Sequence, residues 1–283
     1  MTKEYLFAKK ILEFLNKKTE EIVVVEFGAW DGIRKSNIRK FVLDNCRRAV
    51  FIESDKKRFK KLRKNYINFD NAILLNSFIS TSGLNKFDNL MKNISINKID
   101  FLSIDIDGND YHIFSSIEKF LPEIVCIEFN PTIPFESLYV QENNFSVAKG
   151  SSLGSLKKLF TKKGYSFISV VGINAFFIKN HLVSREIINF GKSENIKYKS
   201  PPAIEMYVGF DGSVFSNVDK IYLNWHKINI PIKDISPVPR YFRSIPSSFS
   251  RLKKIFYYLW LGFKKPDKIN LKNIKTFLES LIY

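Results

Sequence analysis

The sequence predicts an α/β protein built on a mostly parallel, doubly wound sheet, followed by a separate C-terminal extension. Short, continuous runs of β-branched and aromatic residues recur between about residues 20 and 180, as in strands buried on both faces of a parallel sheet. The segments between these runs can hold one helix each, so strands and helices alternate. Of the 283 residues, 45% are hydrophobic, which is enough to build a large core.

Five continuous apolar runs are expected to form the parallel strands: residues 22–27, 49–52, 72–75, 101–104 and 124–129. The first run is closed by Gly28, which ends the strand and begins a turn. Two later runs, at residues 166–171 and 175–178, predict an antiparallel final pair.

Helices are expected before and between these strands, at residues 4–18, 37–45, 56–65, 111–119 and 152–163. The first places Leu6, Ile11 and Leu15 near one face. The helix at 111–119 ends before Pro122, because proline cannot continue a helix. Short crossovers of this kind make a right-handed, doubly wound sheet.

The composition changes after residue 199, so we expect a domain of residues 1–199 and an irregular extension of residues 200–283. Prolines punctuate the extension at positions 201, 202, 231, 237, 239 and 246. Its end, SRLKKIFYYLWLGFKKP, is expected to be helical and joins an aromatic cluster to flanking lysines. Two interpretations stay open. The helix packs its aromatic face on the main domain or a second subunit, or it makes peripheral contact with an anionic membrane surface.

The chain carries a large excess of positive charge. It has 45 Lys and Arg against 28 Asp and Glu, a formal net charge of +17. This excess favours an anionic partner such as a nucleic acid, a membrane surface or a phosphorylated substrate. The same composition is also typical of an AT-rich genome, in which case the charge serves solubility alone.

The cysteines and the N-terminus indicate the compartment. Neither Cys46 nor Cys126 belongs to a C-x-x-C pair or a His/Cys cluster, so neither a disulfide framework nor a thiolate zinc site is expected. Residues 1–18 mix charged and apolar residues, unlike a signal peptide, and no segment approaches the roughly 20 apolar residues of a membrane span. We therefore expect a cytoplasmic protein.

The first strand ends in a loop that carries two acids and two glycines: Glu26, Gly28, Asp31 and Gly32. Gly28 lets the backbone turn sharply and leaves room for a ligand, and Gly32 permits close approach at the start of the following helix. A carboxylate there can accept hydrogen bonds from an ammonium group or from ribose hydroxyls. The fingerprints G-x-G-x-x-G and G-x-x-x-x-G-K-[ST] do not occur, which argues against NAD and a P-loop.

The tips of the next two strands add groups suited to a nucleoside. Glu53 follows the second strand at the place where an acid chelates both ribose hydroxyls, roughly 20 residues after the glycine loop. A lone acid there is otherwise a surface charge or a helix cap, and the preceding loop favours the ribose role. Asn76, Ser77 and Phe78 end the third strand with an amide, a hydroxyl and an aromatic ring that can hold an adenine edge and face.

Acidic residues are concentrated at the carboxyl ends of the fourth and fifth strands. Asp105, Asp107 and Asp110 lie within six residues, and they would repel one another if all were buried, so they must face water, a cation or a cationic ligand. An Asp-Gly turn with Asp110 capping the next helix is the structural alternative. Glu128 ends the fifth strand. Because open α/β sheets bind ligands at the carboxyl ends of their strands, these tips predict a site.

Several strings resemble S-adenosylmethionine-dependent methyltransferases of the FkbM-like kind: EFGAWDG, FIESD, IDIDGNDY, IEFNP, KGSSL and GINAFF. The resemblance runs from about residue 20 to residue 180. It implies a Rossmann-like sheet of seven strands with an antiparallel seventh strand. It also implies O-methylation, often of a sugar hydroxyl in bacterial secondary metabolites or surface polysaccharides.

The resemblance implies that S-adenosylmethionine is held by the residues at the first four strand tips: Glu26, Gly28, Asp31, Gly32, Glu53, Asn76, Ser77, Phe78 and Asp105. The family usually reads Asp-x-Glu-Gly after the fourth strand, whereas this chain has Asp107 in place of the glutamate. A more distant resemblance, to macrolide and aminocoumarin sugar methyltransferases, implies that Asp107 and Glu128 hold a divalent cation, Mg²⁺ or Mn²⁺.

Transfer of a methyl group to oxygen needs a base beside the acceptor, and the candidate catalytic residues are Asp107, His112 and Glu128. Histidine side chains titrate near neutrality, which suits a base. A histidine in the first turn of a helix is otherwise most often a surface or packing residue.

The expected acceptor is a small molecule or glycan, and the positive charge suits an anionic one such as a nucleotide sugar or a capsular polysaccharide unit. A competing hypothesis is a nucleic-acid methyltransferase, suggested by the basic run at residues 56–64. No N-P-P-Y-type motif follows the fourth strand, so no nucleic-acid partner is expected. A third hypothesis is a membrane-surface enzyme that methylates lipid-linked glycans. A homodimer is compatible with the sequence, which does not specify the oligomeric state.

Overall fold

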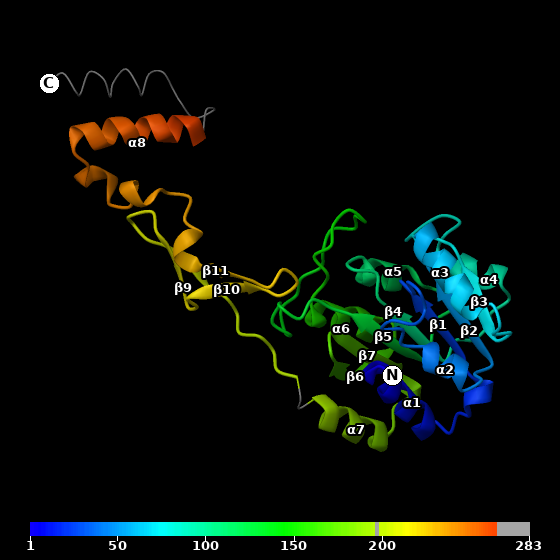
Figure 1. The fold of residues 1–283 in the computed structure, drawn as a ribbon. Helices are drawn as coiled ribbons and strands as arrows, with labels where there is room; N and C mark the ends of the chain where they lie inside the picture. Colours follow the sequence, from blue (N-terminus) through cyan, green and yellow to red (C-terminus); the bar gives the residue numbers. More distant parts are fainter. Residues whose placement is uncertain (196–197, 265–283) are drawn as a thin grey trace. The chain divides into compact units, whose positions relative to one another are not determined.

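The computed structural model describes residues 1–195 and 198–264. The chain divides into two compact units, of which the first ends at Pro202 and the second begins at Ala203. The first unit contains the large sheet, and the second contains two small sheets and the helix α8 (Figure 1). All the candidate catalytic and cofactor-binding residues belong to the first unit.

A seven-stranded sheet with the order β3-β2-β1-β4-β5-β7-β6 forms the centre of the first unit. Its strands are β1 (Val23–Phe27), β2 (Arg48–Ile52), β3 (Ala72–Leu75), β4 (Phe101–Ile104), β5 (Ile124–Glu128), β6 (Tyr165–Val171) and β7 (Asn174–Lys179). Strands β1 to β5 pair in parallel, whereas β7 is antiparallel to both β5 and β6. This topology confirms the expected α/β fold, including the antiparallel final pair.

Helices cover both faces of this sheet. They are α1 (Lys3–Phe14), α2 (Arg39–Leu43), α3 (Lys56–Tyr66), α4 (Phe87–Asn93), α5 (Asp110–Ser116), α6 (Leu153–Lys162) and α7 (Arg185–Asn195), with single 3₁₀ turns at Thr19–Glu21 and Asn180–Leu182. Helices α4, α5 and α6 contribute to one hydrophobic core, and α1, α2, α3 and α7 contribute to the other. The first unit is therefore a three-layer sandwich.

The central strand β1 shows why these runs form a two-sided sheet. All five of its residues are buried. Val23, Val25 and Phe27 belong to the core under α4, α5 and α6, and Val24 belongs to the opposite core. Because side chains alternate along a strand, Glu26 lies on the same face as Val24. A buried acid in an otherwise apolar strand marks a position that hydrophobic burial alone does not explain.

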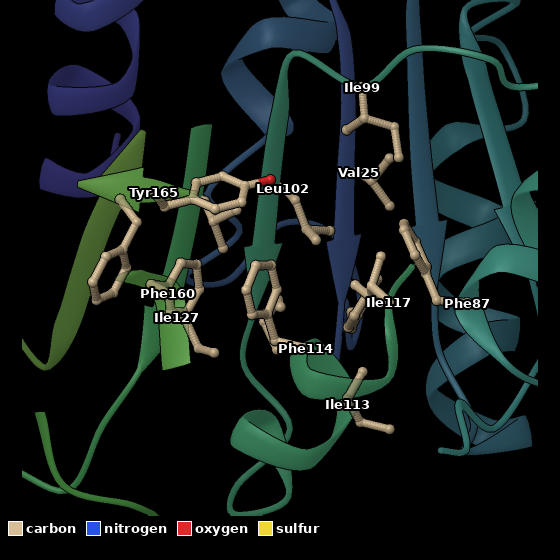
Figure 2. Close-up of a cluster of buried hydrophobic side chains, with 14 of the residues drawn as sticks. Val25, Phe87, Ile99, Leu102, Ile113, Phe114, Ile117, Ile127, Phe160 and Tyr165 are labelled. Carbon is tan, nitrogen blue, oxygen red and sulfur yellow. The ribbon is translucent and has the colours of Figure 1, made fainter. Parts of the chain in front are cut away.

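Aromatic stacking fills the first of these cores, as Figure 2 shows. Phe114 of α5 stacks on Phe160 of α6 with ring centroids 3.8 Å apart. Phe160 also stacks on Phe177 of β7 at 3.8 Å. These contacts fix α5 and α6 against the sheet, and α5 directly follows the acidic loop after β4.

Several helix bounds differ from the predictions. Helix α1 ends at Phe14 instead of residue 18, because Asn16 adopts a left-handed φ of 54°. Helix α5 ends at Ser116 instead of residue 119, because Ile117 is extended. Helices α4 and α7 had no predicted range. Helix α7 buries Ile187 and Gly191 but exposes Ile188, so its sequence has only a short apolar pattern.

The second unit is more regular than the expected extension. Strands β8 (Met206–Val208) and β9 (Val214–Ser216) form one antiparallel pair, and β10 (Lys220–Leu223) and β11 (Ile228–Pro231) form another. Single 3₁₀ turns follow at Ile232–Asp234, Arg240–Phe242 and Pro246–Ser248, before α8 (Arg251–Lys264). The hairpin strands are half-exposed and short, so they lack the continuous apolar runs that reveal buried strands. Within the described ranges, no helix is long and apolar enough to cross a membrane.

Candidate functional site

A cavity of about 360 Å³ lies at the carboxyl ends of β1, β2, β3 and β4, the edge where open α/β sheets bind ligands. This volume falls within the range of small-molecule sites. The lining residues come from the strand tips and from the loops after them: Glu26, Phe27, Gly28, Ala29, Trp30, Arg34, Lys35, Ser36, Asn37, Ile52, Glu53, Ser54, Arg58, Ser77, Phe78, Ile79, Asp105, Ile106, Asp107 and Phe145.

The cavity brings together residues that the sequence places on four separate strand tips. The predicted site residues that line it are Glu26, Gly28, Glu53, Ser77, Phe78, Asp105 and Asp107. The predicted site residues outside its lining are Asp31, Gly32, Asn76, His112 and Glu128. Of the second group, Asp31, Gly32 and Asn76 lie in loops after β1 and β3, His112 lies in α5 and Glu128 ends β5.

Gly28 lets two strand ends approach each other closely. Its φ of +65° is left-handed, and a Cβ at this position would lie 1.9 Å from the backbone oxygen of Asp105. Gly28 follows β1 and Asp105 follows β4, and these two strands are neighbours in the sheet. The absence of a side chain therefore keeps the floor of the cavity open between these two strands.

Asp31 and Gly32 shape the loop behind the cavity. The Asp31 carboxylate accepts hydrogen bonds from the backbone N–H groups of Ile33 and Arg34, both at 2.9 Å. The pKa of Asp31 is lowered, because these hydrogen bonds and the Arg34 charge outweigh the opposing effect of burial. A Cβ on Gly32 would lie 2.4 Å from the Tyr66 ring of α3, so the close approach expected of this glycine is made to a helix.

Glu26 is buried, with 4% of its surface exposed. Its carboxylate accepts hydrogen bonds from the Ser36 hydroxyl and the Asn37 backbone N–H, both at 2.6 Å. Burial raises the pKa of Glu26 to about 7, because desolvation outweighs these two hydrogen bonds. Glu26 thus holds the loop of residues 33–37 against the sheet, at the wall of the cavity.

Glu26→Gln is expected to remove part of the pH dependence of stability. The folded pKa of about 7 lies above the ordinary 4.5, so the folded state binds more protons between these values. The free energy of unfolding then falls as the pH rises from 4.5 to 7, by about 3 kcal/mol for this group. Urea unfolding across this range measures the slope. Glu142→Gln, at an exposed acid paired with Lys149, is the control, and an unchanged slope in Glu26→Gln would contradict the assignment.

Glu53 is also buried, with 3% of its surface exposed, at the end of β2. Its carboxylate accepts hydrogen bonds from the backbone N–H groups of Trp30 and Asp55, both at 2.8 Å. The Asn76 amide donates to the backbone oxygen of Glu53 at 2.8 Å. These contacts fix the Glu53 carboxylate at the cavity wall and join the tips of β1, β2 and β3.

Lining residues that the sequence analysis missed come from loops and helices: Arg34, Lys35, Ser36, Asn37, Arg58 and Phe145. The Arg58 guanidinium lies over the Trp30 ring, 5.2 Å from its centre. The rings of Phe78 and Phe145 meet edge to face at 4.5 Å. Phe145 belongs to a segment without periodicity, between β5 and α6, so no pattern in the sequence identifies it.

Three carboxylates converge beside the cavity. Oxygens of Asp105, Asp107 and Glu128 all lie within 4.8 Å of one another. Asp105 and Asp107 are exposed and Glu128 is half-buried. Burial, followed by the negative charges of Asp105 and Asp110, raises the pKa of Glu128 to about 9. Burial also raises the pKa of Asp105. Ionisation is therefore disfavoured at Glu128 and Asp105, whereas Asp107 is exposed to solvent.

Asp110 stabilises the turn after β4. Its carboxylate accepts hydrogen bonds from the backbone N–H groups of Ile106 and Gly108, at 3.0 and 2.9 Å. Asp110 is 4% exposed, and burial raises its pKa to about 6. The turn places Asp107 in a left-handed conformation, with φ of 58°. The turn of the structural alternative is therefore present, but Asp110 does not cap α5, whose N-cap residue is Asn109. This turn aims the loop that carries Asp107.

His112 connects α5 to the segment between β5 and α6. Its Nε2 lies 2.8 Å from the backbone oxygen of Gln141, so this nitrogen is the donor. The Gln141 side chain is 1% exposed, donates to Asn109 Oδ1 at 3.0 Å and accepts from the backbone N–H of Gly150 at 2.8 Å. Gln141 was not predicted, because a glutamine in a segment without periodicity carries no signal. It holds the loop of residues 141–150 over α5.

A buried amide lies next to the carboxylate cluster. Asn174 begins β7 directly opposite Glu128 of β5, and opposing residues in an antiparallel pair project to the same face of the sheet. Asn174 is 6% exposed, and its Oδ1 has no hydrogen-bond partner among the residues that the structure describes. Its Nδ2 donates to Glu4 of α1 at 3.3 Å. A buried amide oxygen is thus available on the same face of the sheet as Glu128.

Residues 84–167 match the family model described as the Methyltransferase FkbM domain. The match spans α4, β4, α5, β5, α6 and the start of β6, and it includes Asp105, Asp107, His112 and Glu128. It confirms the resemblance to FkbM-like methyltransferases. No curated protein matches the chain.

Solved structures show weak similarity to the chain. A putative S-adenosylmethionine-dependent methyltransferase from Listeria monocytogenes is 10% identical, with a TM-score of 0.42 over 62% of this chain and 97% of that chain. A methyltransferase from Aquifex aeolicus is 11% identical, with a TM-score of 0.37 over 60% and 87% of the two chains. The pre-rRNA processing protein fibrillarin from Methanococcus jannaschii is 16% identical, with a TM-score of 0.39 over 57% and 67%.

Proposed function

We propose that the chain, an S-adenosylmethionine-dependent methyltransferase, methylates a sugar hydroxyl of an anionic acceptor, either a nucleotide-activated sugar or a unit of a surface polysaccharide. The observation that carries this proposal is the cluster of Asp105, Asp107 and Glu128 beside the cavity. Carboxylates suit a polyhydroxylated acceptor, because they accept hydrogen bonds from hydroxyl groups and can take up a proton.

The cavity fits S-adenosylmethionine in size and in chemistry. Each Glu53 oxygen accepts one backbone hydrogen bond and keeps a second acceptor position, which can receive a ribose hydroxyl. Phe78 offers a ring face and Ser77 a hydroxyl to an adenine. Gly28 leaves room for the ligand at the sheet edge. When bound, the cofactor supplies an electrophilic methyl group on a positively charged sulfur.

Glu53→Ala is expected to weaken S-adenosylmethionine binding about 10- to 100-fold, because a charge-assisted pair of hydrogen bonds is lost. Isothermal calorimetry measures the change. Asp55→Ala is the matched control, because Asp55 lies two residues away and is not a lining residue of the cavity, and its carboxylate accepts from the Arg58 backbone N–H at the start of α3. Equal affinity in Glu53→Ala and wild type would show that Glu53 does not hold the ribose.

Asp107 is the residue that we assign as the base. It lines the cavity and is exposed, so an acceptor hydroxyl can reach it. Glu128 has a raised pKa and is suited to hold a hydroxyl through hydrogen bonds. The Nε2 of His112 is engaged by the Gln141 carbonyl, which leaves Nδ1 as its free acceptor. His112 therefore contributes to catalysis in one of two ways. It positions the 141–150 loop, or its Nδ1 accepts the proton of the acceptor hydroxyl.

The carboxylate cluster also fits a divalent cation. Asp105, Asp107 and Glu128 offer an all-oxygen ligand set within 4.8 Å, which Mg²⁺ and Mn²⁺ prefer. Asn174 adds the second observation, because its buried Oδ1 lacks a partner within the described residues and projects from the same face as Glu128. A cation held there would orient vicinal sugar hydroxyls and relieve the repulsion between the acids.

The cationic residues at the cavity favour an anionic acceptor. Arg34 and Lys35 lie in the loop after β1 and line the cavity together with Arg58. Lys35 also interacts electrostatically with Asp105. A phosphate or diphosphate on the acceptor can pair with Arg34 or Lys35 while its sugar faces the acids. The basic residues of α3 other than Arg58 do not line the cavity, which favours a small acceptor over a nucleic acid.

Incubation with S-adenosylmethionine labelled on its methyl group tests the proposal. The acceptors are nucleotide sugars, polysaccharide fragments and RNA. We expect label in the first two, in products that resist mild base as an ether does. Label in RNA alone would refute the sugar acceptor and favour the nucleic-acid hypothesis.

A chelator tests the cation separately. We expect EDTA to abolish turnover and Mg²⁺ or Mn²⁺ to restore it. Asn174→Ala should raise the cation concentration needed for half-maximal activity, whereas Asn144→Ala, in the 141–150 loop, should not. Full activity in EDTA would exclude the cation and leave Asp107 as a metal-independent base.

A further inference from the structure

Helix α8 exposes a row of large apolar side chains. Leu252, Phe256, Leu259 and Phe263 recur every three or four residues, so they lie along one side of the helix. Their exposed fractions are 69%, 55%, 57% and 90%. A continuous apolar row of this kind is rare on a protein surface that contacts only water.

A neighbouring side of α8 is already occupied. Tyr257 and Trp260 pack on Phe242, with ring centroids 5.5 and 5.7 Å apart, and Tyr257 also meets Phe249 at 5.3 Å. The Lys253 ammonium lies 4.5 Å from the Phe249 ring centre. These contacts fix the rotation of the helix within its own unit, so the row of Leu252, Phe256, Leu259 and Phe263 faces outward.

The charge of α8 is entirely positive. The helix contains Arg251, Lys253, Lys254 and Lys264 and no acidic residue. The basic residues lie near both ends of the helix, so the apolar row has cationic groups within about one turn of each of its ends. This is the arrangement of a helix that lies in a membrane interface, with apolar side chains among the acyl chains and lysines at anionic headgroups.

We propose that α8 binds an anionic lipid surface through Leu252, Phe256, Leu259 and Phe263, with Arg251 and Lys254 pairing with headgroups. The positive charge of α8 favours an anionic lipid surface over a second copy of the chain as the binding partner. Two α8 helices packed through their apolar rows would bring their basic residues together, which costs free energy, whereas anionic lipids neutralise them. The proposal does not depend on the identity of the methyl acceptor.

Flotation of the full chain with vesicles tests the proposal. We expect flotation with vesicles of phosphatidylglycerol and phosphatidylcholine, and much less with phosphatidylcholine alone. Phe256→Glu with Phe263→Glu should lower the partition coefficient by more than about tenfold. Both side chains are exposed, so the fold should survive. Phe210→Glu, at a 95% exposed phenylalanine outside α8, is the control and should float like wild type.

The basic residues need a separate variant. Arg251→Gln with Lys254→Gln should lower partition onto anionic vesicles by about fivefold for each charge removed. High salt should have a similar effect on the wild-type chain. A failure to float, or equal flotation of the Phe256/Phe263 variant and wild type, would overturn the proposal. Light scattering that shows a dimer, lost in that variant, together with no flotation, would assign the row to a second copy instead.

Discussion

Gly28→Ala is expected to abolish cofactor binding and to lower the free energy of unfolding by about 4 kcal/mol or more. The added Cβ would lie 1.9 Å from the backbone oxygen of Asp105, and backbone cannot move aside as a flexible side chain can. The φ of +65° adds strain for any residue with a Cβ. Relief of the clash requires β1 and β4 to separate at the end where the cavity opens.

Substitution of a second glycine, Gly83, distinguishes the effect of the steric clash from the effect of backbone strain. Gly83 has a φ of +76°, and a Cβ placed on it meets nothing within 4 Å. Gly83→Ala is therefore expected to cost only about 1 kcal/mol, from the left-handed backbone alone. Thermal and urea unfolding measure both variants, and calorimetry measures their affinity for S-adenosylmethionine. Similar losses in the two variants would show that close approach of β1 and β4 is not what requires Gly28.

The strands of the large sheet could be predicted from the sequence, because a strand that is buried on both faces consists of a continuous run of apolar residues. β3 and β4 begin and end where their apolar runs do, and the other parallel strands differ by one residue at an end. The short hairpin strands of the second unit contain no fully buried residue, so no continuous apolar run marks them. Helix ends were less predictable, because they depend on single left-handed residues such as Asn16, whose conformation has no periodic signature.

The strand-tip residues of the site could be predicted for a topological reason. Parallel strands bring their carboxyl ends to one edge of the sheet, so Glu26, Glu53 and Asp105 were expected at the same edge once parallel strands were predicted. Phe145 and Gln141 could not be predicted, because their places depend on how a segment without periodicity folds back over α5 and β3. That fold depends on buried hydrogen bonds such as those of Gln141, which pair groups far apart in the sequence.

Substitution of the acceptor-side residues is expected to reduce turnover with little change in cofactor affinity. If Asp107 is the base, Asp107→Asn should lower kcat by about 10² to 10⁴. Glu128→Gln should lower kcat less if Glu128 only holds a hydroxyl, because a protonated carboxyl and an amide can both donate and accept hydrogen bonds. His112→Gln should act on KM for the acceptor, because the Gln141 carbonyl that His112 holds belongs to the loop over α5.

Three readouts distinguish these roles. Calorimetry should give all three variants nearly wild-type affinity for S-adenosylmethionine, since Asp105 and Glu53 remain in the cavity wall. Glu142→Gln, at an exposed acid of the same loop region, is the control and should keep wild-type turnover. A loss of kcat in His112→Gln as large as in Asp107→Asn would assign the base to His112 Nδ1. Near-normal turnover in all three variants would place the acceptor away from the carboxylate cluster, along the segment of residues 132–150 that carries Phe145.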